Sequence, residues 1–241
     1  MPLPTITTPT YELKLPSSGK KIKYRPFLVK EEKILIIALE SKGQSEITNA
    51  VKDVLKKCVL TRGVNVDSLP TFDIEYIFLN IRSKSIGEAI NVRVTCPDDG
   101  ETEVPVTIYV DEIQVVKSKD HKIDIPLDDK MTLRMKYPSI NQFVETNFDI
   151  KDDPLENVSK TFKIISDCID TIFTQEDAWE AKDYSEKERV EFIEQLNSKQ
   201  YKEVERFFAT MPKLSHTIEI TNPNTKKKSS VVLEGLSDFF G

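Results

Sequence analysis

The stretch AINVRVTCPDDGETEVPVTIYV, residues 89–110, shows the clearest strand pattern in the chain. On both sides of its centre, apolar side chains alternate with polar ones, a period of two that is typical of β-strands. The centre itself, Cys96-Pro97-Asp98-Asp99-Gly100, contains an Asp-Gly pair, which favours a tight hairpin connection. The sequence therefore predicts an antiparallel hairpin over these residues.

A second stretch, near the end of the chain, has the same organisation. His216, Ile218 and Ile220 alternate with polar residues, and a turn at Asn222-Pro223-Asn224-Thr225 precedes a returning strand over 230–233. This turn corresponds to the one in the first hairpin. We expect the two hairpins to pair with each other as the two hairpins of a zinc ribbon do.

The first turn has the form of a zinc knuckle, Cys-Pro-x-Cys-Gly, with the second cysteine replaced. A zinc ribbon needs four ligands, two from each knuckle. The corresponding positions are Cys96, Asp99, Asn222 and Thr225. One of these four is a thiol, and amide and hydroxyl side chains are poor zinc ligands. We therefore predict no metal and no cofactor, and we expect side-chain packing to hold the hairpins together.

Helical periodicity dominates on either side of the first hairpin. The dense apolar run within 30–40 predicts a helix that is buried on most of its faces. Apolar residues spaced three and four apart predict a long amphipathic helix from Leu155 to Phe173. Further helices are expected over 45–59, 71–85, 140–148, 185–196 and 198–208, and further short strands over 11–15, 22–26, 113–116, 121–125 and 131–137.

The order of hairpin, helices, strands, helices and hairpin predicts an α+β fold, in which helical, bundle-like segments surround a small antiparallel β part. We expect four segments: 1–87, a hairpin with helices; 88–137, β structure; 138–212, helices; and 213–241, a hairpin and tail that pair with 88–137. A further possibility is that both β segments form one sheet, with the helices from Ile140 to Phe208 inserted between its strands.

The composition narrows the function. Of 241 residues, 34 are Lys or Arg and 40 are Asp or Glu, so the formal net charge is 34 − 40 = −6. This balance argues against general nucleic-acid binding and against anionic membrane surfaces. The two histidines, His121 and His216, lie outside any Ser-His-Asp or HExxH context, and Cys58 and Cys168 fall on or beside apolar helix faces. We predict no catalytic residue.

Two segments are candidates for contact with another chain. The N-terminal stretch holds Leu3 and Ile6 between prolines, a composition that favours an extended arm. Phe239 and Phe240 stand at the other end, and such rings are costly to leave in water. Either they dock back onto their own domain, or they insert into a partner, since large aromatic residues are common binding anchors.

Several longer segments resemble the T4-type phage baseplate hub proteins, a family that includes the hub subunit and the hub assembly catalyst of contractile-tailed phages. The segments span nearly the whole chain: YELKLPSSGK at 11–20, YRPFLVKEEK at 24–33, FDIEYIFL at 72–79, IRSKSIGE at 81–88, the Cys96-Pro97 knuckle, and LEGLSDFF at 233–240.

This resemblance implies a structural or chaperone-like assembly protein that binds other hub and tail proteins, with the tape-measure protein among the candidates. It implies expression in the host bacterial cytoplasm, and it leaves open the stoichiometry and whether the protein stays in the virion tail. Some family members carry cysteine pairs at both knuckles. This chain departs from them at positions 99, 222 and 225, which argues against a zinc requirement.

Two other classes of function remain as alternatives. A degenerate zinc-ribbon module would bind nucleic acid, in transcription for example, and its support is limited to the basic stretches 20–25 and 226–228. A hydrolase with a carboxylate pair would need a nucleophile, a base and an orienting group together, and no such set is evident in the sequence. The adjacent carboxylates, such as Asp98-Asp99 and Glu31-Glu32, fall in turns or at helix starts.

Overall fold

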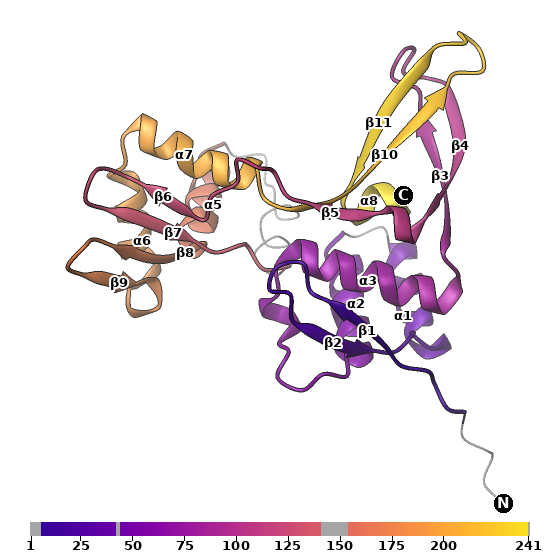
Figure 1. The fold of residues 1–241 in the computed structure, drawn as a ribbon, viewed down its shortest axis with the longest axis horizontal. Helices are drawn as coiled ribbons and strands as arrows, with labels where there is room; N and C mark the ends of the chain where they lie inside the picture. The colour runs from indigo at the N-terminus through magenta and orange to yellow at the C-terminus, as the bar shows by residue number, and fades with distance from the viewer. Residues whose placement is uncertain (1–5, 42–43, 141–153, 241) are drawn as a thin grey trace, which may run out of the picture. The chain divides into compact units, whose positions relative to one another are not determined.

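The computed structural model describes residues 6–41, 44–140 and 154–240, which form two compact units (Figure 1). The first unit comprises the chain up to Val116 together with the chain from Lys213 onward, and the second comprises Lys117–Pro212. The second unit is therefore inserted into the first. Within the described ranges, every helix is too short or too polar to span a bilayer.

The first unit begins with a hairpin, continues with helices, and is completed by two further hairpins and a short helix. Its elements are β1 (Tyr11–Lys14), β2 (Lys21–Tyr24), α1 (Val29–Ser41), α2 (Gln44–Cys58), η1 (Val66–Ser68), α3 (Thr71–Ile86), β3 (Ala89–Thr95), β4 (Glu103–Tyr109), η2 (Val110–Glu112), β5 (Gln114–Val116), β10 (Lys213–Thr221), β11 (Lys228–Glu234) and α8 (Gly235–Phe240).

Both predicted hairpins are present. β3 pairs antiparallel with β4, and β10 pairs antiparallel with β11. β10 also pairs with β5, with Leu214 opposite Val115, so the sheet order is β11-β10-β5. The C-terminal hairpin is thus joined through β5 to the segment that precedes the second unit.

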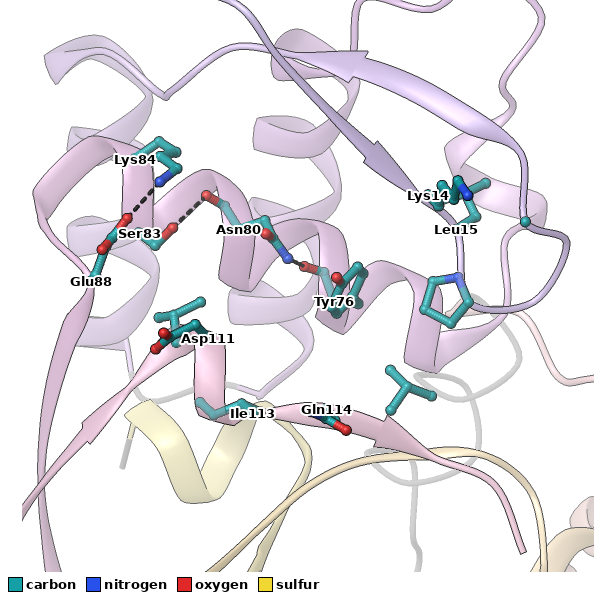
Figure 2. A pocket seen from close by; sticks show the side chains of 14 residues that line it. Lys14, Leu15, Tyr76, Asn80, Ser83, Lys84, Glu88, Asp111, Ile113 and Gln114 are labelled. Carbon is teal, nitrogen blue, oxygen red and sulfur yellow. Dashed lines mark hydrogen bonds and ion pairs between the residues drawn. The ribbon is translucent and has the colours of Figure 1, made fainter. Parts of the chain in front are cut away.

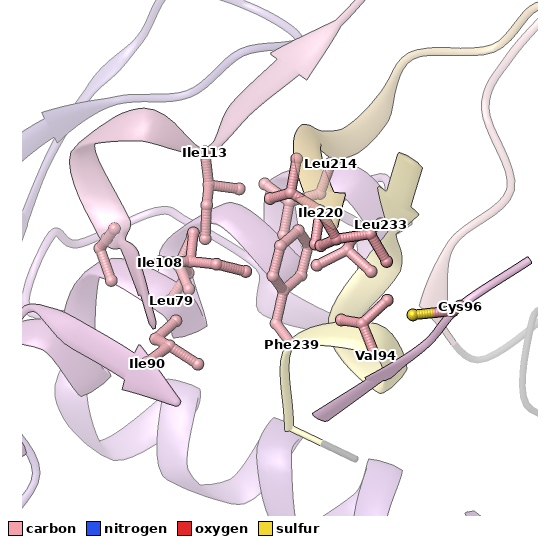
Figure 3. Close-up of a cluster of buried hydrophobic side chains, with 12 residues drawn as sticks. Leu79, Ile90, Val94, Cys96, Ile108, Ile113, Leu214, Ile220, Leu233 and Phe239 are labelled. Atoms are coloured by element: carbon pink, nitrogen blue, oxygen red, sulfur yellow. The ribbon is translucent and has the colours of Figure 1, made fainter. Parts of the chain in front are cut away.

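One core joins these hairpins to α3. Alternate residues of the strands turn inward, and they pack with Leu79 of α3 and Phe239 of α8, which are 0% and 1% exposed (Figure 3). The cluster consists of the buried residues Leu79, Ile90, Val94, Cys96, Ile108, Val110, Ile113, Leu214, Ile218, Ile220, Leu233 and Phe239.

The second unit packs helices against an antiparallel sheet with the strand order β6-β7-β8-β9. Leu133 of the sheet and Val204 of a covering helix are both 0% exposed. The elements of this unit are β6 (Asp124–Pro126), β7 (Thr132–Met135), α5 (Pro154–Asp167), β8 (Ile169–Phe173), β9 (Ala178–Glu180), η3 (Ala181–Asp183), α6 (Glu186–Glu194) and α7 (Ser198–Ala209).

The predicted helix from Leu155 to Phe173 is wrong in its last third. The helix ends at Asp167, and Ile169–Phe173 forms β8, which pairs with both β7 and β9. The guanidinium of Arg189 donates to the Ser166 carbonyl oxygen at 3.2 Å, one of the acceptors that the end of a helix leaves free. The β-branched residues of this segment suit a strand, and pairing on both edges outweighs the helical spacing.

Two further expectations differ from the structure. The boundaries expected at 87/88 and 137/138 differ from the boundaries of the two units. β3, β4 and β5 belong to the first unit, and β6 and β7 share a sheet with β8 and β9 of the second unit. The helix expected to be buried on most faces, α1, exposes Ile36 by 49% and Ile37 by 56%. The helix expected over 140–148 lies, after its first residue, outside the described residues.

The position of Phe239 predicts that this residue is needed for stability. Replacing Phe239 with alanine would empty a buried site and cost about 3–5 kcal/mol of unfolding free energy. The control is Val232→Ala on β11, where the side chain is 52% exposed and the expected loss is below about 1 kcal/mol. Urea unfolding followed by circular dichroism measures both, and equal losses would contradict the prediction.

Candidate functional site

The two knuckle-like turns share one backbone hydrogen bond and one left-handed residue. The Gly100 N–H donates to the Cys96 carbonyl at 2.9 Å, and the Lys226 N–H donates to the Asn222 carbonyl at the same distance. Gly100 and Lys226 both have a left-handed conformation, with φ of 70° and 62°. Cys96 therefore corresponds to Asn222, as the sequence comparison of the turns predicted.

Hydrogen bonds connect one turn to the other. Asn222 is 1% exposed. Its side-chain amide donates to Asp98 Oδ1 at 3.0 Å and to Asp99 Oδ2 at 2.8 Å. The Thr225 hydroxyl donates to Asp98 Oδ2, and Asn224 Nδ2 donates to Thr102 Oγ1 at 3.0 Å. We call these residues the turn cluster. The expected association of the hairpins is confirmed, with hydrogen bonds added to the predicted packing.

The turn cluster does not suit zinc. Asn222 presents N–H groups to the carboxylates, and its own Oδ1 accepts the N–H groups of Asn224 and Thr225 at 2.8 and 3.2 Å. Zinc in structural sites requires thiolate, imidazole or carboxylate ligands in a tetrahedral set. Within the described ranges, no group of three or more His, Cys, Asp or Glu side chains is placed to hold a metal ion.

The electrostatics follow from these contacts. Hydrogen bonds from Thr225 and Asn222 lower the pKa of Asp98, and hydrogen bonds led by the Thr102 hydroxyl lower the pKa of Asp99 well below its usual range. Burial and the two neighbouring carboxylates raise the pKa of Cys96. Because the thiolate is the form that binds metals and attacks electrophiles, Cys96 is kept in its unreactive form.

The other thiols and the two imidazoles are buried or hydrogen-bonded. Burial raises the pKa of Cys58 to about 11 and that of Cys168 to about 12. The ring nitrogens of His121 lie 3.0 Å from Thr210 Oγ1 and 2.9 Å from Tyr137 Oη, and His216 Nδ1 lies 3.2 Å from the Glu112 carbonyl oxygen. Both histidines therefore have hydrogen-bond partners in the structure.

A pocket of about 700 Å³, which we call the α3 pocket, lies along one face of α3 (Figure 2). Tyr76, Asn80, Ser83 and Lys84 of α3 line it, together with the β1–β2 turn region on one side and the segment from Val110 to Val115 on the other. The pocket is an open depression on the surface of the first unit rather than an enclosed cavity.

Local hydrogen bonds build the α3 pocket. Asp73, in the first turn of α3, accepts the N–H of Ser17 at 2.9 Å and so holds the β1–β2 turn against the helix. Asn80 Nδ2 donates to the Tyr76 carbonyl at 2.8 Å, and the Ser83 hydroxyl donates to the Asn80 carbonyl at 3.0 Å. The sequence pattern did not predict this pocket. Tyr76, Asn80, Ser83 and Lys84 are spaced three and four positions apart, but α3 carries other polar residues, such as Asp73 and Arg82, that obscure this spacing.

A second exposed feature is the apolar face of α1. Val29 is 80% exposed, and Ile36 and Ile37 follow on the same helix. Glu31 anchors the helix start, because it accepts the N–H of Leu28 at 2.8 Å and pairs with Arg25 at 3.0 Å. We call Val29, Ile36 and Ile37 the α1 face.

The residues predicted to contact another chain differ in their exposure. Ile6 is 91% exposed and precedes the first strand, as an arm for another chain requires. Phe239 lies in the core, so the alternative in which it inserts into a partner is wrong. Leu3 and the side chain of Phe240 lie outside what the structure describes.

The described residues thus include exposed apolar side chains on α1 and a pocket beside α3, and the described thiols and imidazoles are buried or hydrogen-bonded. The family model of the T4 bacteriophage base plate protein matches residues 8–241. The chain therefore belongs to the T4 bacteriophage base plate protein family, a structural family whose members work with other baseplate proteins. A search of the curated proteins and a search of the solved structures each gave no match.

We expect the turn cluster to stabilise the first unit. Replacing Asn222 with alanine removes both amide donors and leaves two backbone N–H groups without their acceptor, at a cost of about 1–3 kcal/mol. The control is Asn224→Ala, an exposed residue of the same turn, with an expected cost below about 1 kcal/mol. Urea unfolding compares the two variants, and the reverse order would contradict this role.

The lowered pKa of Asp98 and of Asp99 also predicts a pH dependence. Folding favours the ionised carboxylates, so their contribution is complete above the ordinary Asp pKa of about 3.9 and declines as the pH falls toward the folded-state values. The variant Asp99→Asn should lose less stability between about pH 5 and pH 2.5 than the parent chain. The control is Val232→Ala on β11, which removes no titratable group, so its stability should vary with pH as that of the parent does.

Proposed function

We propose that this protein is a subunit or an assembly factor of the central hub of a contractile phage tail baseplate, and that it acts by binding other hub and tail proteins. The observation that carries the proposal is the match to the baseplate family over residues 8–241. The hub assignment rests on the hub-like segments at 11–33, 72–88 and 233–240. The buried or hydrogen-bonded state of the thiols and imidazoles supports a binding role without catalysis.

The α1 face supplies a surface for such binding. A fully buried Val or Ile side chain contributes about 1.5–3 kcal/mol relative to an exposed one, so covering these three residues would stabilise a complex substantially. Val29, Ile36 and Ile37 lie on one helix, and we propose that a partner covers them together. In this proposal the partner is another protein of the hub, which covers the α1 face when the two assemble in the host cytoplasm.

The first experiment is recovery of the tagged protein from phage-infected cells, with mass spectrometry of the complex and of purified virions. Hub and tape-measure proteins in the complex, with the protein also present in virions, would identify a structural subunit. The same partners without the protein in virions would identify an assembly factor. Recovery of polymerase or nucleic acid without tail proteins would overturn the proposal in favour of the ribbon-module alternative.

The same assay tests the α1 face. The double variant Ile36→Ser, Ile37→Ser should reduce recovery of hub partners by about tenfold or more, because the apolar area to be buried is lost. Its unfolding free energy should stay within about 1 kcal/mol of the parent, since both side chains are already largely exposed. The control is Lys199→Ser at an exposed position of α7 in the second unit, with unchanged recovery expected. Full recovery with the double variant would remove the α1 face from the proposal.

A further inference from the structure

The exposed side of α1 carries opposite charges at the two ends of its apolar centre. Val29, Lys33, Ile36, Ile37 and Glu40 are exposed, and their spacings of three, four and seven positions place them on one side of the helix. Lys33 comes before the two isoleucines, and Glu40 comes after them. Along this side the order is therefore a positive charge, an apolar pair and a negative charge.

These two charges have no partner on the described part of their own chain. Among the residues that the structure describes, the side chains of Lys33 and Glu40 take part in no ion pair and no hydrogen bond. By contrast, Lys30 Nζ lies 3.7 Å from Glu31 Oε1. Glu40 also lies in the last turn of α1, where the helix dipole disfavours a negative charge. A positive group from outside would improve the surroundings of Glu40.

The exposed side of α1 is complementary to itself in one orientation. When two α1 helices lie antiparallel about a two-fold axis between Ile36 and Ile37, the isoleucines of one copy face those of the other. Because Lys33 and Glu40 are equally far from this axis, Lys33 of each copy lies opposite Glu40 of the other. A parallel arrangement would instead place like charges opposite each other, which is unfavourable. The charge pattern therefore selects a second copy in the antiparallel orientation.

We infer that two copies of the chain associate through their α1 faces as an antiparallel pair, with Ile36 and Ile37 at the two-fold axis and Lys33 of each copy paired with Glu40 of the other. Such a contact uses the same surface on both copies, so it closes at two. One helix face is small beside the roughly 800 Å² per partner of a standard interface, so the dimer is weak and reversible. The apolar centre supplies the affinity, and the exposed ion pairs mainly set the orientation.

For its biological role, this inference rests on the proposed function. The hub partner and the second copy cover the same residues, so the binding of one excludes the other. The dimer would keep Val29, Ile36 and Ile37 away from water until a hub partner replaces the second copy. A weak contact suits this role, because a tight dimer would compete with assembly of the hub.

Sedimentation of the purified full-length chain tests the inference. From about 5 to 500 µM we expect an equilibrium between monomer and dimer. Lys33→Glu alone, or Glu40→Lys alone, should weaken dimerisation by about tenfold or more, because two attractive pairs become two repulsive ones. The control is Lys199→Glu on α7, which makes the same change of charge at an exposed position of the second unit and should leave dimerisation unchanged.

Combining the charge changes gives the sharpest result. Equal amounts of the Lys33→Glu chain and the Glu40→Lys chain should form a mixed dimer about as stable as that of the parent, because every opposed pair is again of opposite sign. The double variant Lys33→Glu, Glu40→Lys should dimerise by itself for the same reason. Recovery in the mixture also demonstrates that the single variants fold.

Three results would overturn the inference: a parent chain that stays monomeric over this range, single variants that dimerise as the parent does, or a mixture that does not restore the dimer. The test needs no hub protein, so it is separate from the proposed function. A monomeric parent whose hub recovery still depends on Ile36 and Ile37 would leave the hub proposal standing. A dimer with the expected charge dependence, from a chain that recovers no tail proteins, would overturn the hub proposal and keep the dimer.

Discussion

The first unit depends on the return of the chain to β5 after the second unit. β10 pairs with β5, β11 extends the sheet, and α8 then places Phe239 beside Leu79 of α3. Without this return, α3 and the β3–β4 hairpin would expose the apolar residues that form one side of the core. These contacts join residues far apart in sequence, which slows folding, although the entropic cost of loop closure grows only slowly with the length of the inserted segment.

In the turn cluster, hydrogen bonds between side chains connect the two knuckle-like turns. A structural zinc site contributes roughly 10–16 kcal/mol in isolated zinc-finger peptides, whereas a single hydrogen bond contributes about 1 kcal/mol net. The hydrogen bonds of Asn222 and Thr225 therefore fix the relative position of the turns but are too weak to support the hairpins alone. The stability has to come from the hydrophobic core beneath, and the hydrogen bonds give that core a defined arrangement.

The surfaces left open in the first unit suit a protein of a large assembly. The α1 face exposes apolar side chains beside the charged Lys33 and Glu40, the β5 edge is unpaired within the described residues, and Ile6 is exposed. In a monomer that works alone, each of these features would promote aggregation. In a protein of the baseplate family, such features suit contact with other chains.

The sequence by itself determined the local structure: both hairpins, the correspondence of Cys96 with Asn222, and the α+β class. These features depend on alternation and turn residues, which act over a few positions. Only the tertiary structure decided that Ile169–Phe173 is a strand, that α1 exposes Ile36 and Ile37, that Phe239 is buried, and that α3 and β5 enclose a pocket. Periodicity shows that a side chain prefers burial, but the surface that buries it is contributed by residues far away in the chain, and the sequence pattern alone does not identify them.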